Sequence, residues 1–252
     1  MRAVMRFALL GTLQVSQDDG TPVTIRQPRC RALMVILLLQ AGRPVTSGRL
    51  ADMLWGENMP PRGPTGALHT HICQLRKLLP GGRLARVDTG YQLAVHPGEL
   101  DLEEFRRLTA LGQRELDEHR HLTAADLLSQ GLGLWREPHL ADAPATVSMS
   151  GVLRQIMEEH QAARESLIEA RLALGHHRAL LPELQAHAVA QPENERLCGY
   201  RMLALYRSGR RTEALSAYRH ITAILADGYG IDPGPDLQRL HQQILTDRPS
   251  LR

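Results

Sequence analysis

Apolar residues along the first hundred positions follow both the strand period and the helix period, whereas later positions follow the helix period alone. Two short apolar runs at residues 7–15 and 22–25 are separated by a polar turn at 17–20, which predicts a hairpin. Residues 29–40 are apolar nearly all round. They predict a centrally buried helix after the hairpin.

A second and a third helix follow. Thr46 or Ser47 can cap a helix that Gly56 terminates. From Pro64 onward apolar residues recur at helical spacing and form one stripe, which comprises Leu68, Ile72, Leu75 and Leu79. The sequence therefore predicts three helices in a row, the last with a narrow apolar face.

A short hairpin follows the third helix. Pro80, Gly81 and Gly82 stop the helix, and the turn 88–90 separates Arg86 and Val87 from the alternating segment 91–95. Its apolar side can dock onto the helices. A recognition helix followed by such a hairpin is the pattern of a winged helix.

The face opposite the apolar stripe is polar and carries no carboxylate, which suits a polyanion. By the helical wheel this face comprises Gly66, Thr70, Cys73, Gln74 and Lys77. We predict that it enters the major groove of double-stranded DNA, with Gln74 reading adenine and Thr70 meeting a thymine methyl group or a phosphate. The simpler alternative is that these are solvated polar residues.

Basic residues flank that face and would meet phosphates, which position a protein without reading sequence. This flanking set is His69, His71, Arg76, Arg83 and Arg86. Its two last members lie near the root of the hairpin.

Beyond residue 98 the strand signals vanish and seven segments show apolar spacings of three or four. The segments are 101–119, 123–135, 148–174, 178–190, 193–208, 211–226 and 235–245. Within 203–225, Ala214 stands four residues before Tyr218, as in a tetratricopeptide helix pair. We predict an α+β winged helix-turn-helix domain at 1–97 and an all-α tetratricopeptide-like domain at 98–252.

Composition agrees with two domains of different character. The 252 residues are 43% hydrophobic, enough for two cores. Residues 1–100 hold 12 Arg plus Lys against 6 Asp plus Glu, and residues 101–252 hold 18 against 21. This split favours nucleic acid as the partner of the first part and a protein as the partner of the second.

The sequence lacks the motifs typical of disulfide-rich or zinc-binding proteins, of several enzyme classes, and of secreted or membrane proteins. Cys30, Cys73 and Cys198 show no paired spacing, so neither a disulfide framework nor a zinc ribbon is indicated. The chain has no G-x-S-x-G, GxxxxGK or GxGxxG motif, so we expect no enzyme and no cofactor. The apolar start is too short for a signal peptide, and the longest apolar run falls well below the ~20 residues of a membrane span. We expect a cytoplasmic, nucleoid-associated protein that does not bind membranes.

Six motifs resemble the Streptomyces antibiotic regulatory proteins, a family of pathway-specific transcriptional activators. They are RALMVILLLQAGRPV, RLADMLWGENMPP, LHTHICQLRKLL, GYQLAV, ELDLEEF and LYRSGRRTEALSAYRHITAILADGYGIDPGPDLQRLHQQIL. The resemblance implies an OmpR-like winged helix followed by a bacterial transcriptional activation domain. It also implies binding to tandem promoter repeats near −35 and recruitment of RNA polymerase holoenzyme. Larger relatives add ATPase and sensor domains, whereas this chain resembles the small type.

The resemblance adds two expectations about partners. The loop between the second and third helices contacts polymerase in OmpR-like proteins, so Trp55, Glu57 and Arg62 are candidates for contact with its sigma, alpha or beta subunit. Trp55 is also a candidate core anchor. A homodimer on DNA would place two recognition helices on repeats about one helical turn apart. The alternatives are a helical-repeat adaptor that binds only proteins, which leaves the carboxylate-free helix unexplained, and a repressor with the same fold.

Overall fold

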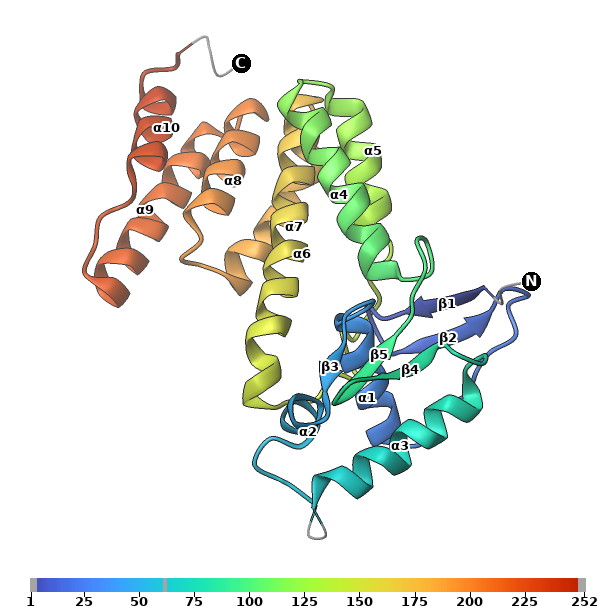
Figure 1. Ribbon diagram of the computed structural model, residues 1–252. Coiled ribbons are helices and arrows are strands. Elements are labelled where there is room, and N and C mark those ends of the chain that lie inside the picture. The colour runs from blue at the N-terminus through green and yellow to red at the C-terminus, as the bar shows by residue number, and fades with distance from the viewer. Residues whose placement is uncertain (1–3, 61–62, 249–252) are drawn as a thin grey trace. The chain divides into compact units, whose positions relative to one another are not determined.

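The computed structural model describes residues 4–60 and 63–248 (Figure 1). The chain divides into two compact units. The first comprises residues 1–110 and 129–161, and the second comprises residues 111–128 and 162–252. Three helices contribute residues to both units: α4 (Asp101–Asp117), α5 (His121–Leu132) and α6 (Val147–Ala173).

The first unit begins with a two-stranded antiparallel sheet of β1 (Met5–Ala8) and β2 (Gln14–Gln17). The prediction of one strand over 7–15 is therefore wrong. The backbone amides of Leu9 and Leu10 donate to the two carboxylate oxygens of Asp101, at 2.7 and 3.1 Å, so the chain leaves the strand there. The second predicted run, 22–25, contributes only a bridge from Pro22 to Ser16.

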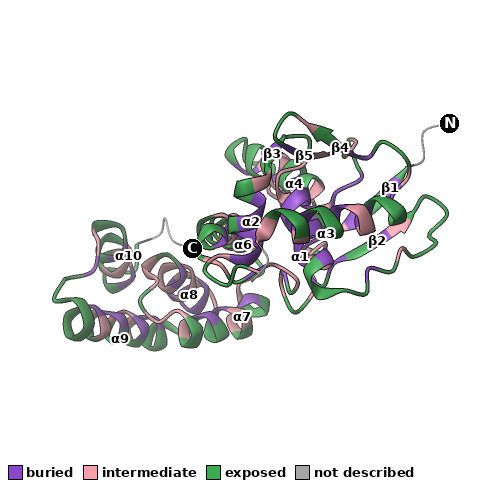
Figure 2. Ribbon diagram, turned by 60° about the horizontal axis from the view of Figure 1, so that its bottom comes forward, coloured by how far each residue is buried: buried purple, intermediate pink, exposed green. Residues whose placement is uncertain are grey.

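Three helices follow as predicted. In α1 (Pro28–Leu39) eight of the twelve residues are buried, and Figure 2 shows the buried part of the helix in purple. The hydroxyl of Thr46 caps α2 (Ser47–Trp55) by accepting a hydrogen bond from the Arg49 amide. The predicted apolar stripe of α3 (Pro64–Leu78) is buried against the other helices.

The wing is a three-stranded sheet in the order β3-β5-β4, with β4 (Leu84–Val87) and β5 (Gly90–Leu93) forming the predicted hairpin. The third strand, β3 (Val45–Thr46), was not predicted from the sequence. A Cβ atom at Gly90 would lie 2.0 Å from the Val45 carbonyl oxygen, so only glycine allows β3 to pair this closely with β5.

Residues beyond the wing complete the first unit. Asp142 receives two hydrogen bonds of 2.6 Å from the guanidinium of Arg31 on α1 and one of 2.7 Å from the Leu13 amide. Thr146 donates to the Met53 carbonyl at the end of α2. The domain boundary predicted at residue 98 stays a prediction. Hydrogen bonds within the first compact unit join residues on the two sides of that position.

The second unit contains α7 (His177–Ala190), α8 (Glu195–Arg207), α9 (Arg211–Tyr229) and α10 (Pro235–Leu245). With α4, α5 and α6 they are the seven predicted helices, and their ends lie within three residues of the predicted ones. Ala214 is fully buried in the core that joins α8, α9 and α10, and Tyr218 stacks on His241 with ring centroids 3.7 Å apart. This is the small-then-aromatic packing that the sequence predicted.

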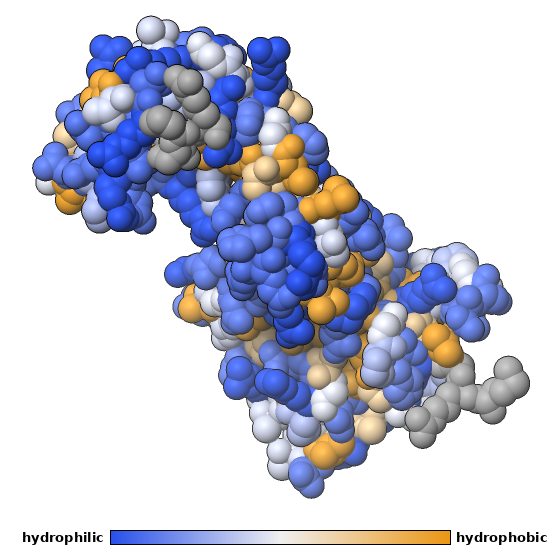
Figure 3. Space-filling view, turned by 90° about the horizontal axis from the view of Figure 1, so that it is seen from above, coloured by the Kyte–Doolittle hydropathy of each residue, from blue (hydrophilic) through white to orange (hydrophobic). Residues whose placement is uncertain are grey.

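The visible surface in Figure 3 is mostly hydrophilic, with hydrophobic side chains in small groups. Among the described helices, none is both long enough and apolar enough to cross a lipid bilayer.

Candidate nucleic-acid interface

Helix α3 presents an outward face without negative charge. His69, Thr70 and Lys77 are exposed there, and residues 58–87 contain no carboxylate. Arg76 and Lys77 occupy the last turn, where cations stabilise the negative end of the helix dipole. A polyanion can approach this face with no repulsion from an acidic side chain of the helix.

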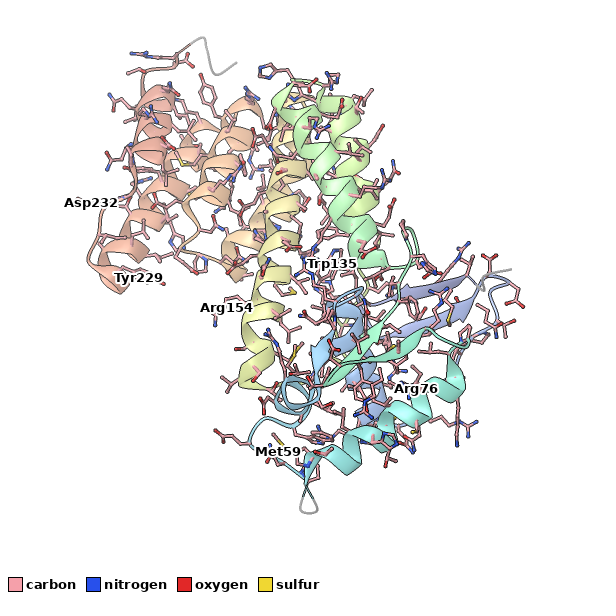
Figure 4. The ribbon with its side chains drawn as sticks, in the orientation of Figure 1. Met59, Arg76, Trp135, Arg154, Tyr229 and Asp232 are labelled. Carbon is pink, nitrogen blue, oxygen red and sulfur yellow. The ribbon has the colours of Figure 1, made fainter. Side chains whose placement is uncertain are left out.

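Arg76 connects the helix to the wing. Its Nε donates to the Leu84 carbonyl of β4 at 2.9 Å, and its guanidinium carbon lies 5.8 Å from the centre of the Tyr91 ring on β5 (Figure 4). The side chain is nevertheless exposed. Arg76 therefore both fixes the angle between α3 and the wing and keeps a positive charge at the surface.

Gln74, the predicted adenine reader, is half-buried and turns its amide oxygen inward. The thiol of Cys30 on α1 donates to that oxygen at 3.0 Å, and Nδ1 of His71 lies 3.5 Å from it. Burial raises the pKa of the Cys30 thiol, which keeps it protonated and able to donate. The amide nitrogen is left as the group that Gln74 can present outward.

Thr70 and His69 lie on the exposed side of the helix. The Thr70 hydroxyl donates to the Gly66 carbonyl one turn earlier, so its methyl group and its two lone pairs are the parts that a base would meet. Nε2 of His69 lies 3.5 Å from the Cys73 sulfur. Arg86 is exposed on β4, within the wing.

The residues predicted to contact polymerase differ in their exposure. Trp55 is 5% exposed and its ring centre lies 6.2 Å from that of His71, so it is a core anchor and not a surface contact. This corrects its inclusion among the polymerase contacts. Glu57 is exposed, and Arg62 lies outside the described residues.

Arg83 corrects a second prediction. It was expected to meet phosphate, but its side chain is 6% exposed and its guanidinium donates to both carboxylate oxygens of Glu99, at 2.5 and 2.6 Å. It also donates to the Ala94 carbonyl at 3.2 Å. A guanidinium held in this way cannot reach DNA, so Arg83 belongs to the support of the wing.

Glu99 is the residue that sequence reasoning missed. Burial alone would raise the pKa of its carboxyl, but hydrogen bonds from Arg83 and from the amides of His96 and Met5 outweigh burial and lower the pKa to about 2. The carboxylate thus joins β1, the wing and the residues that follow the wing. The available signal was the pair of carboxylates in Glu99-Leu100-Asp101, directly after Pro97 and Gly98.

Comparison with known proteins agrees with this geometry. Residues 20–92 match the family described as "Transcriptional regulatory protein, C terminal", and residues 100–245 match the "Bacterial transcriptional activator domain". The regulatory protein DnrI of Streptomyces peucetius is 33% identical, over 98% of this chain and 94% of DnrI. The chain belongs to the Streptomyces antibiotic regulatory protein family. The relatives that match along nearly the whole chain are named as regulatory proteins.

Other members of the family are longer. The regulatory protein AfsR of Streptomyces coelicolor is 38% identical over 98% of this chain, which spans only 25% of AfsR. The solved structure of Mycobacterium tuberculosis EmbR, in complex with a low-affinity phosphopeptide, superposes with a TM-score of 0.90 at 34% identity. It covers 98% of this chain, which spans 66% of that structure. The predicted fold class, a winged helix followed by a helical domain, is confirmed.

Proposed function

We propose that the chain is a sequence-specific activator of an antibiotic biosynthetic pathway, which binds tandem promoter repeats near −35 and recruits RNA polymerase. The observation that carries the proposal is the carboxylate-free face of α3, beside a wing that exposes Arg86. Membership in a family of transcriptional activators supports the same function.

The limited number of base contacts that one α3 helix can make supports binding by two copies of the chain, which we propose lie on direct repeats. One α3 helix offers the base contacts of a single half-site, which gives limited specificity. Two protomers side by side, on repeats about one helical turn apart, double those contacts without a two-fold axis. In this arrangement the acidic helical part of the chain and the loop at Glu57 face partners other than DNA, polymerase among them.

A mobility-shift assay tests the proposal. The purified protein is mixed with the promoters surrounding its own gene at two salt concentrations, with random DNA as competitor. We expect a shift that resists the competitor on a promoter with repeats, followed by stimulated transcription when purified polymerase is added. A shift that random DNA abolishes equally would contradict sequence-specific binding.

Lys77→Ala should weaken binding to every DNA sequence alike. Lys77 is exposed at the end of α3 and would meet phosphate, so its loss should reduce the slope of log K against log salt by about one. Fluorescence anisotropy on cognate and random duplexes measures the slope. Arg114→Ala, which removes an exposed arginine of α4, should leave the slope unchanged. An unchanged slope in Lys77→Ala would remove Lys77 from the interface.

The orientation of Gln74 changes the base that it should read. Adenine requires a donor and an acceptor from glutamine, but here the oxygen accepts from Cys30. We therefore propose that the Gln74 amide nitrogen donates to guanine N7 or O6, or to thymine O4. Cys30→Ala frees the oxygen and should move the preference at one base position toward adenine, by about tenfold.

Selection from a random duplex library measures this preference. Gln74→Ala should remove discrimination at the same position, and Cys198→Ala, a thiol substitution in α8, should change nothing. If Gln74→Ala lost equal affinity for cognate and random DNA, Gln74 would not read a base. If Cys30→Ala kept the parental preference, the thiol would not set the orientation of the amide.

A further inference from the structure

A groove in the second unit is lined by residues of α7, α8 and the first turn of α9. Its volume is about 610 Å³, within the range of sites that bind ligands. The residues used below are Arg178, Leu181 and Pro182 of α7, Arg201 and Leu205 of α8, and Arg210 before α9.

The groove has a surplus of positive charge. Three arginines line it, one near each of the three helices, against the single carboxylate of Glu213. Arg210 is paired with Glu213 at 2.7 Å, whereas the guanidinium groups of Arg178 and Arg201 form no hydrogen bond or ion pair with any residue that the structure describes. Residues 101–252 carry more acidic than basic side chains, so the positive charge of this arginine cluster is opposite in sign to the net charge of that part of the chain.

Glu213 is a carboxylate within the groove that is stabilised in its charged form by the neighbouring arginines. Its pKa is lowered, first by the hydrogen bond from Arg210, with further contributions from the charges of Arg210 and Arg201. The planar guanidinium fork suits bidentate contact with a carboxylate, and a second arginine nearby is available for another one. The groove therefore already holds one carboxylate and has guanidinium groups for more.

The floor of the groove suits a peptide better than a small anion. Leu181, Pro182 and Leu205 give it an apolar part, and the buried Ser208 hydroxyl has no hydrogen-bond partner among the described residues. Pro182 has no N–H, so α7 lacks the hydrogen bond to the Arg178 carbonyl one turn earlier. An extended peptide supplies amides, carboxylates and apolar side chains together.

We propose that this groove binds an acidic peptide segment of a partner protein, with its carboxylates on Arg178 and Arg201 and an apolar side chain between Leu181 and Leu205. Helical-repeat proteins use such concave surfaces for extended ligands. The inference does not depend on DNA binding, because every residue that carries it lies in the second unit.

Selection of random peptides displayed on phage, against the immobilised full chain, tests the proposal. We expect enriched peptides rich in Asp and Glu with at least one large apolar residue. Synthetic copies labelled with fluorescein are then titrated with the protein. Arg178→Gln and Arg201→Gln should each weaken binding about tenfold. Arg219→Gln, the same charge change on α9 outside the groove, should leave affinity within about twofold.

Each other result would overturn the proposal. No enriched peptide, enriched peptides without surplus acid, or groove variants that bind the peptides as tightly as the parental protein would each exclude an acidic-peptide site here. Inorganic phosphate at millimolar concentration could also displace the labelled peptides. If it did so as effectively as unlabelled peptide, the groove would be a small-anion site instead. Circular dichroism and thermal unfolding of the variants confirm that the affinities compare folded proteins.

Discussion

Arg83→Ala should strongly destabilise the winged helix instead of merely weakening its contact with DNA. The substitution leaves the buried carboxylate of Glu99, 4% exposed, without the guanidinium that neutralises it. Breaking one partner of a buried ion pair costs about 3–5 kcal/mol. That is a large share of the ~5–15 kcal/mol by which a domain is stable. Urea unfolding followed by circular dichroism measures the loss.

Arg86→Ala is the matched control, because it removes an arginine three residues along the same hairpin. Arg86 is exposed, so its loss should change the free energy of unfolding by no more than about 0.5 kcal/mol. It should instead weaken binding to all DNA sequences. If Arg83→Ala kept the parental unfolding midpoint and lost only DNA affinity, Arg83 would belong to the interface after all.

Acid provides a second readout of the same ion pair. The pKa of Glu99 is lowered from 4.5 to about 2 in the folded chain, so the pair contributes its full stability above pH 4.5. That contribution is lost as the pH falls from 4.5 toward 2, because the unfolded chain binds the proton first. Glu99→Gln should have a lower stability at neutral pH and a shallower decline over this interval.

The sequence predicted the parts of the structure that depend on near neighbours. The stripe of α3 and the turn at Asp88 are local patterns, and each predicts its element without knowledge of the rest of the chain. The seven helices beyond residue 98 are local patterns as well. Membership in the family followed from motifs that run along the same elements.

The contacts that the sequence did not predict join residues distant along the chain. Arg83 was predicted to contact phosphate because it lies at the root of the wing, but its partner Glu99 is 16 residues further on. Gln74 was predicted to contact adenine because of its place on the helical wheel, but Cys30, 44 residues earlier, takes its oxygen. Periodicity predicts the face of the helix or strand on which a side chain lies. It does not predict which residue from another part of the chain contacts that side chain.

The same argument applies to the first strand. Residues 7–15 look like one continuous strand, yet Asp101 captures two of their amides across more than 90 positions. The Asp101 side chain is 11% exposed, and its loss of contact with water raises the pKa of its carboxyl, although amide hydrogen bonds and Arg136 act against that shift. Carboxylates beyond residue 98 therefore decide the path of the chain at its beginning.

A fragment of residues 1–97 should not unfold cooperatively. It lacks Glu99, Asp101 and Asp142, whose carboxylates bind Arg83, the amides of Leu9 and Leu10, and Arg31. Each loss leaves buried or half-buried donors without acceptors, at about 1–3 kcal/mol apiece, and together they remove a large share of the ~5–15 kcal/mol by which a domain is stable. The fragment also loses the buried side chain of Phe105.

Tryptophan fluorescence reports directly on the folding of the fragment, because Trp55 is the single tryptophan of residues 1–97. In the full chain Trp55 is 5% exposed, so the full chain carrying Trp135→Phe gives the emission of buried Trp55 alone. The fragment should emit at longer wavelength and show no sigmoidal thermal transition. A transition within about 5 °C of the full chain would instead support a self-sufficient domain ending at residue 97.

Restoring the missing carboxylates should restore the fold. Residues 1–110 joined to 129–161 by a short glycine-serine linker reproduce the first compact unit, with Glu99, Asp101 and Asp142 all present. We expect this single chain to regain the blue-shifted emission of Trp55 and a cooperative transition. The same joined chain carrying Asp142→Ala should melt at a lower temperature, because Arg31 and the Leu13 amide then lose their common acceptor. The smallest part of the first unit that folds is thus defined by three carboxylates, and all three lie beyond the sequence boundary at residue 98.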